Sequence, residues 1–122
     1  MNSNKNKSPL FSDLEVVKNE YSDRDYEINV SIPEFNCVCP RTGLPDFANI
    51  EINYTPNKSI VELKSLKLYI VKFRFLGIFH EHVTNKIFDD FKKACSPKRI
   101  EVVGHFHPRG GIKTSVRASS EE

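Results

Sequence analysis

The chain has 122 residues, 39% of them hydrophobic and 28% charged, which is the size and composition of one globular domain. Its 18 basic and 16 acidic residues are scattered, without a basic tract that could follow a phosphate backbone, so nucleic acid is not required as a direct partner. No run approaches the ~20 apolar residues that cross a bilayer, and no apolar signal-peptide core precedes residue 25. We expect a cytoplasmic protein without a membrane partner.

The three cysteines are an odd set, and two of them, Cys37 and Cys39, are separated by one residue. This pattern does not suit the paired disulfide framework of a small secreted domain. We therefore expect reduced thiols, whose reactivity is the property of interest.

The first 24 residues are rich in Asn, Lys, Ser and Asp. Such a segment buries little apolar surface, so residues 1–24 are predicted to form a mobile or loosely docked arm. A single domain is expected over residues 25–117, followed by a polar tail at residues 118–122.

Two runs of alternating apolar and polar residues follow, at residues 26–32 and 48–54. A period of two is typical of half-buried strands, and these two are expected to pair as an antiparallel hairpin. Between them, residues 35–46 contain two prolines and one glycine and are predicted to form an irregular loop. Such a loop can carry functional residues while the strands hold it in place.

Two helices are predicted from apolar residues that recur every three or four positions. The first covers residues 66–76, with Ser65 as N-cap and Gly77 as C-cap, and the second covers residues 83–94. The turn between them is short, so the helices are expected to pack as an antiparallel pair.

Strand patterns return around residues 100–102 and 112–116. The order strand, strand, helix, helix, strand, strand predicts an α+β fold, in which both helices cover one face of a four-stranded antiparallel sheet. Such a sheet has two open edges, and pairing between copies can close them, so a symmetric homo-oligomer is expected.

The first candidates for chemistry are Cys39, in the Pro-containing loop, and Asp46, at its end. A thiol becomes nucleophilic when it loses its proton, and a carboxylate folded back across the loop can accept that proton. The alternative is a small buried cysteine and a turn-forming aspartate. Cys95, at a helix end, has the features of a structural thiol.

Polar residues at the two helix starts are candidates for ligand binding. His80, Glu81 and His82 open the second helix, where a carboxylate gains from the helix dipole and can accept two N–H groups of a base. Glu62, just before the first helix, is placed to do similar work. The alternative in both places is a solvated helix cap.

Cations at two places in the chain suit a phosphate group. Lys64 and Lys67 are neighbours on one helix face, beside backbone amides that favour anions. Arg109 precedes Gly110 and Gly111, whose backbone can approach a ligand closely. Solvated lysines and an ordinary hairpin turn are the alternatives.

Three pairs of Cys or His residues at a spacing of two are possible metal ligands: Cys37 with Cys39, His80 with His82, and His105 with His107. None of the pairs has the CxxC or HxxxH spacing typical of zinc sites. The last pair fits equally well as surface residues of a strand. We expect no metal.

Four motifs in order carry a family resemblance: Cys39-Pro40 with Thr42-Gly43 and Pro45-Asp46-Phe47, ELKSLKLY at 62–69, FHE at 79–81, and HPRGG at 107–111. From about residue 25 to residue 117 the chain resembles the 7-cyano-7-deazaguanine reductases of queuosine biosynthesis, in their branch with a single short module. The resemblance implies the tunnelling fold, which is related in architecture to GTP cyclohydrolase I.

The resemblance also implies a mechanism, in which Cys39 attacks the nitrile carbon of 7-cyano-7-deazaguanine and forms a covalent thioimide. Asp46 would activate the thiol and protonate the nitrogen, and two hydrides from NADPH would give the aminomethyl product. The chemistry is consistent, because a nitrile is a poor hydride acceptor until sulfur has added to it.

By the same resemblance, binding roles fall on residues of all the later motifs. The deazaguanine ring would be held by Val61, Glu62, Leu63, His80 and Glu81. His80 would also act at the reacting group. NADPH would be held by Lys64, Lys67, Arg109 and Gly110. No Rossmann fingerprint is present, so the cofactor would bind by another route. The family builds these sites where subunits meet, which implies pentameric rings or decamers made of two rings.

The chain departs from the family pattern at two places. Asn36 and Cys37 precede Val38 where Thr and a small residue are usual, so a second thiol lies close to Cys39 and competes with it for oxidation. Leu63 replaces the Ser usually found after the glutamate, which removes one polar contact.

Two other functions stay open. An archaeal relative forms the same thioimide but transfers ammonia to the nitrile on tRNA; it lacks the lysine-bearing motif, so Lys64, Lys67 and Arg109 favour reduction. A non-catalytic tunnelling-fold protein that binds a purine or tRNA would form no covalent adduct on Cys39.

Overall fold

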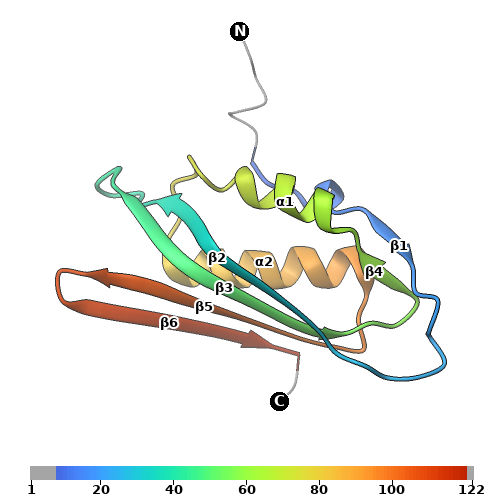
Figure 1. Ribbon diagram of the computed structural model, residues 1–122. Coiled ribbons are helices and arrows are strands. Elements are labelled where there is room, and N and C mark those ends of the chain that lie inside the picture. The colour runs from blue at the N-terminus through green and yellow to red at the C-terminus, as the bar shows by residue number, and fades with distance from the viewer. Residues whose placement is uncertain (1–7, 121–122) are drawn as a thin grey trace, which may run out of the picture.

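The computed structural model describes residues 8–120 and contains one four-stranded antiparallel sheet with two helices on one face (Figure 1). The strand order is β2-β3-β5-β6, formed by β2 (Ile28–Val38), β3 (Pro45–Thr55), β5 (Arg99–Arg109) and β6 (Ile112–Ser119). The helices α1 (Leu63–Val71) and α2 (His80–Cys95) run in opposite directions. The predicted α+β class and the order ββααββ are confirmed. Within residues 8–120, neither helix is long and apolar enough to cross a membrane.

The core lies between the sheet and α2, and it follows from the two periodicities of the sequence. Alternate residues of β3 turn their side chains toward the helices, and α2 presents apolar residues at intervals of four. The ring of Tyr54 on β3 meets that of Phe91 on α2 edge to face, with 4.8 Å between centroids. Fully buried members of this layer include Ile50, Ile52, Val83, Ile87, Val102 and Phe106.

A glycine allows α2 to lie close to β5. A Cβ atom at Gly104 would lie 2.6 Å from the Thr84 hydroxyl oxygen and 2.8 Å from a ring carbon of Phe106. We therefore expect Gly104→Ala to lower the free energy of unfolding by about 1–3 kcal/mol, the usual cost of overpacking a filled core. Chemical denaturation measures this change. Val103→Ala, on the opposite face of the same strand, is the control and should cost less.

The sheet strands are longer than predicted, and the loop between β2 and β3 is correspondingly shorter. The alternation of β2 is interrupted by a register shift between Ile32 and Phe35, after which the strand continues to Val38. Because the bulge resets which side chains face inward, Phe35 and Cys37 become buried. The predicted loop over residues 35–46 was therefore wrong at both ends, and residues 39–44 form the connection.

The predicted caps of the first helix were also wrong. Glu62 is the N-cap, because its carboxylate accepts hydrogen bonds from the backbone of Lys64 and Ser65 at 2.9 and 2.8 Å. The helix ends at Val71, well before Gly77, which forms a bridge to Val38 instead. The apolar period predicted too late a helix end, because the turns that follow the helix also bury side chains, including that of Phe73.

A two-stranded ribbon, which the sequence pattern did not indicate, joins the N-terminal segment to the α1 side of the fold (Figure 1). It pairs β1 (Val16–Lys18) with β4 (Ser59–Val61), and it follows the 3-10 turn η2 (Phe11–Asp13). Leu14 is buried in the core cluster, and Asp13 forms an ion pair with Lys72 at 2.9 Å. Residues 8–24 thus have defined contacts, whereas residues 1–7 of the predicted arm lie outside the described residues.

The β5–β6 connection is a tight hairpin turn. Gly110 and Gly111 have φ values of +60° and +81°, a conformation that favours glycine, and Arg109 pairs with Ile112 across the turn. The turn fixes Arg109 at the end of β5. In the predicted polar tail, residues 118 and 119 belong to β6, and residues 121–122 lie outside the described residues.

Candidate active site

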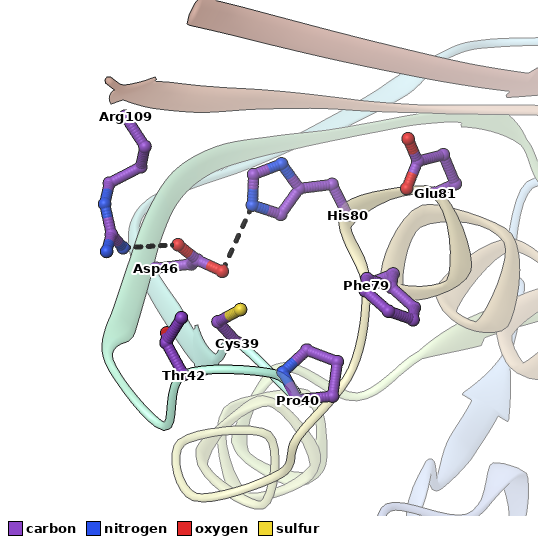
Figure 2. Close-up of a pocket in the computed structure, with 8 residues that line it drawn as sticks. All are labelled: Cys39, Pro40, Thr42, Asp46, Phe79, His80, Glu81 and Arg109. Carbon is purple, nitrogen blue, oxygen red and sulfur yellow. Dashed lines mark hydrogen bonds and ion pairs between the residues drawn. The ribbon is translucent and has the colours of Figure 1, made fainter.

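A pocket of about 330 Å³ opens at the end of the sheet where the β2–β3 loop, the start of α2 and the end of β5 meet (Figure 2). Its lining residues are Cys39, Pro40, Thr42, Asp46, Phe79, His80, Glu81 and Arg109. The backbone of Val38 is tied to the segment before α2, since its N–H donates to Leu76 O and its carbonyl accepts from Ile78 N, both at 3.0 Å. The loop and the helix start are therefore held together.

A buried carboxylate is the electrostatic centre of this pocket. Asp46 is only 6% exposed, because it takes an inward-facing position near the start of β3. One of its oxygens accepts from Arg109 Nη1 at 2.7 Å, and the other lies 3.2 Å from His80 Nε2. The guanidinium of Arg109 and the ring nitrogen of His80 offset the cost of taking this carboxylate out of water.

The orientation of His80 is fixed from two directions. As the first residue of α2 it leaves the helix start toward the sheet, and its ring stacks on that of Phe106, with 3.9 Å between centroids and 6° between planes. The stacking directs Nε2 at Asp46 (Figure 2). His80 can therefore hold or pass a proton in contact with the carboxylate.

Cys39 is held in the pocket by a compact loop. Its N–H donates to Leu44 O and its carbonyl accepts from Gly43 N, both at 2.9 Å, and Gly43 has a φ of +76°. The pKa of the Cys39 thiol is lowered by a hydrogen bond from the Thr42 hydroxyl and then by the backbone N–H groups of Thr42 and Arg41. A thiol with a lowered pKa at a pocket wall is suited to nucleophilic attack.

The pKa values of the other two cysteine thiols are raised, in contrast to that of Cys39. Burial raises the pKa of Cys37 to about 12, with the nearby Asp46 carboxylate adding to the effect, and burial raises that of Cys95 to about 12. Both side chains are buried, and all three thiols are free. Cys95 thus has the burial expected of a structural thiol, and the reactivity of Cys39 stays a prediction.

The remaining predicted ligand-binding residues lie at α1, away from this pocket. Val61 is buried in β4, Glu62 caps α1, and Lys64 is exposed in its first turn. Leu63 and Lys67 line a second hollow, of about 360 Å³, between α1 and the edge strand β2. The start of α1 lies toward the opposite end of the sheet from the β5–β6 hairpin (Figure 1).

Within a single chain, the predicted site residues therefore lie in two separate groups. Cys39, Asp46, His80, Glu81 and Arg109 share the first pocket, with Gly110 in the adjoining turn. The α1 group contains the other predicted cofactor and substrate residues. Thr42 also lines this pocket and was not among the predicted site residues; its place three residues after Cys39, before a glycine, is the signal that could have identified it.

The histidines of the proposed metal pairs are dispersed. His82 packs on Phe79, His105 hydrogen-bonds with Ser115 at 3.2 Å, and His107 lies against Phe47. Among residues 8–120, no three His, Cys, Asp or Glu side chains gather as metal ligands. The absence of a metal stays a prediction.

Known proteins resemble this chain in fold and in sequence. A solved structure of an archaeosine synthase QueF-like protein in the apo form superposes with a TM-score of 0.73 at 20% identity, covering 79% of this chain and 94% of that one. This likeness shows the fold, which is the tunnelling fold. A family model described as QueF-like protein matches residues 45–122.

Relatives with higher sequence identity indicate the enzyme family to which the chain belongs. The NADPH-dependent 7-cyano-7-deazaguanine reductase of Chloroherpeton thalassium is 55% identical over 108 residues, which cover 88% of this chain and 93% of the relative. The enzyme of that name from Anaeromyxobacter sp. is 56% identical over 110 residues, covering 90% of each chain. The fold and these relatives thus define a tunnelling-fold oxidoreductase. The chain belongs to the family of NADPH-dependent 7-cyano-7-deazaguanine reductases.

Proposed function

We propose that this protein reduces the nitrile of 7-cyano-7-deazaguanine to the aminomethyl group with NADPH, in the cytoplasm, as a step of queuosine biosynthesis. The observation that carries the proposal is the Cys39 thiol, whose lowered pKa suits attack on carbon, in one pocket with the Asp46 carboxylate and His80. Relatives at 55% and 56% identity bear the name of this activity.

The chemistry begins with a bond between Sγ of Cys39 and the nitrile carbon. As the carbon–sulfur bond forms, one carbon–nitrogen π bond breaks and the nitrogen takes a proton, giving a thioimide. The proton comes from the Asp46–His80 pair, which faces the pocket and can be reloaded from solvent. The adduct is more electrophilic than the nitrile, and it retains the substrate until reduction is complete.

The residues at α1 fit a dinucleotide cofactor. Lys67 and Arg74 bring positive charge to a hollow that also exposes apolar side chains such as Leu63, which suits phosphates beside a ring system. Lys64 adds a cation at the start of the helix. With Arg109 and Gly110, these residues would hold NADPH. Two NADPH molecules in succession would each supply one hydride for conversion of the nitrile to the amine.

A second copy of the chain would complete the site. The α1 group and the thiol pocket line different hollows of one chain, yet the proposed reaction needs substrate and cofactor residues from both. Among the described residues, β2 and β6 are the edge strands of the four-stranded sheet. Apart from the bridge of Val38 to Gly77, their outer edges carry no strand pairing, and one hollow lies along β2. We infer a closed ring with sites between neighbours, pentameric or paired into a decamer.

Intact mass spectrometry tests the covalent step. When the protein is mixed with 7-cyano-7-deazaguanine without NADPH, we expect its mass to rise by that of one substrate molecule per chain. Cys39→Ala should show no increase, whereas Cys95→Ala, which removes a buried thiol, should still form the adduct. A substrate that binds without any adduct would favour a non-catalytic binding protein. An adduct that ammonia converts to an amidine, with no NADPH consumption, would favour amidine synthesis over reduction.

A further inference from the structure

We propose that Arg109 is a positioning residue of the chemical step, whose guanidinium holds the Asp46 carboxylate in place before any cofactor binds. The inference rests on the proposed function and deepens it, because the family resemblance assigns Arg109 to NADPH alone. It also gives the two carboxylate oxygens different tasks. Oδ1 is held by Arg109, and Oδ2 exchanges the proton beside His80.

One nitrogen of the guanidinium makes two contacts with the start of β3. Nη1 of Arg109 donates to the carbonyl oxygen of Pro45 at 2.8 Å and to Oδ1 of Asp46 at 2.7 Å. This nitrogen carries two hydrogens, so each hydrogen has its own acceptor. The guanidinium therefore ties the carboxylate to the backbone of the preceding residue and restricts rotation of the Asp46 side chain.

The hairpin turn holds Arg109 where it can reach the carboxylate. Arg109 pairs with Ile112 across the turn, which the positive φ values of Gly110 and Gly111 close. In Figure 2 the guanidinium meets one oxygen of Asp46 and the His80 ring meets the other. The end of β5 and the start of α2 thus fix this carboxylate from two sides.

The different tasks of the two oxygens follow from what each partner can do with a proton. A guanidinium stays charged in proteins, whereas an imidazole nitrogen can hold or release a proton. The proton for the nitrile nitrogen therefore leaves from Oδ2, which lies 3.2 Å from His80 Nε2. As the O–H bond breaks and the N–H bond forms, the electron pair stays on the carboxylate. Arg109 at Oδ1 stabilises that negative charge.

Arg109 has donors left for the cofactor while it holds Asp46. Within residues 8–120, its Nε and Nη2 make no hydrogen bond, and 43% of its side chain is exposed. These donors can meet a phosphate while Nη1 stays on the carboxylate. Loss of Arg109 should therefore also slow a step that needs no NADPH.

Formation of the Cys39 adduct without NADPH tests this positioning role. Protein mixed with 7-cyano-7-deazaguanine alone is sampled over time by intact mass spectrometry. We expect Arg109→Ala to form the adduct about 10- to 100-fold more slowly than the wild type, because a reacting group loses a hydrogen bond that orients it. Millimolar guanidinium chloride should restore part of the rate, whereas sodium chloride at the same ionic strength should not. Arg109→Lys, which keeps a cationic donor, should be slower than the wild type but faster than the alanine variant.

The matched control is Arg117→Ala, at an exposed position of β6 outside the pocket-lining residues, where Arg117 pairs with Glu101. It should form the adduct at the wild-type rate. Equal rates in Arg109→Ala and the wild type, or a slow variant with a native circular dichroism spectrum that guanidinium does not rescue, would overturn the proposal. If the alanine variant does not fold, a wild-type rate in Arg109→Lys would overturn it. A wild type that forms no adduct would refute the proposed function itself.

Discussion

Asp46→Asn is expected to lower kcat for nitrile reduction by about 10²–10⁴-fold, the range typical of a lost proton-transfer group, with little change in the fold. Asparagine preserves the shape of the side chain but cannot exchange a proton with the substrate nitrogen. Arg109, 43% exposed, can be solvated once its carboxylate partner is gone, so the pocket should stay folded. The loss of NADPH absorbance measures the rate, and circular dichroism checks the fold.

The matched control for this variant is Asp89→Asn. It makes the same chemical change at an exposed position of α2, outside the residues that line the pocket, and should leave kcat close to the wild-type value. A kcat for Asp46→Asn within tenfold of the wild type would show that the carboxylate does not transfer the proton. His80 would then be the group to test next.

Two variants that are inactive alone should recover activity when their subunits are mixed, if each site takes residues from two copies. Cys39→Ala removes the nucleophile from the first pocket, and Glu62→Gln removes a proposed substrate ligand at α1. In a closed ring with equal, random mixing, about a quarter of the sites would combine two intact halves. Co-expression with two affinity tags, purification through both and an NADPH assay measure the recovered rate.

A second mixture provides the control for this experiment. Cys39→Ala and Asp46→Asn change residues that line the same pocket of one chain, so no combination of these subunits rebuilds an intact site. Activity in this mixture would point to exchange or reversion instead of complementation. If the first mixture stays inactive although both tags are present, the site belongs to one chain and the inferred assembly is wrong.

Local patterns in the sequence predicted much of the fold, because each pattern depends on residues close together in the chain. The alternation over residues 26–32 and 48–54 predicted two of the sheet strands, and both helices were found. Boundaries were less accurate where a local signal was ambiguous. The bulge after Ile32 reset the strand period, and Glu62 displaced Ser65 as the cap because its carboxylate reaches two backbone N–H groups.

The ribbon of β1 and β4 shows what such patterns miss. Each strand has only three residues, too few to display a period, and each is stable only because the other lies beside it. The pairing joins segments more than 40 residues apart, as in Val16 with Val61. Nothing in residues 8–24 alone signals this pairing, which explains why the sequence indicated a loose arm.

The sequence by itself determined the class of fold, because strand and helix periods are local, and it indicated candidate residues for the chemistry, because the Cys39 and Asp46 motifs have definite spacing. Only the tertiary structure decided how those residues act on one another. Arg109 is 63 positions from Asp46 yet donates to it, while Thr42 and the loop backbone lower the pKa of Cys39. Electrostatic interactions depend on distances in space, which folding sets and chain order does not.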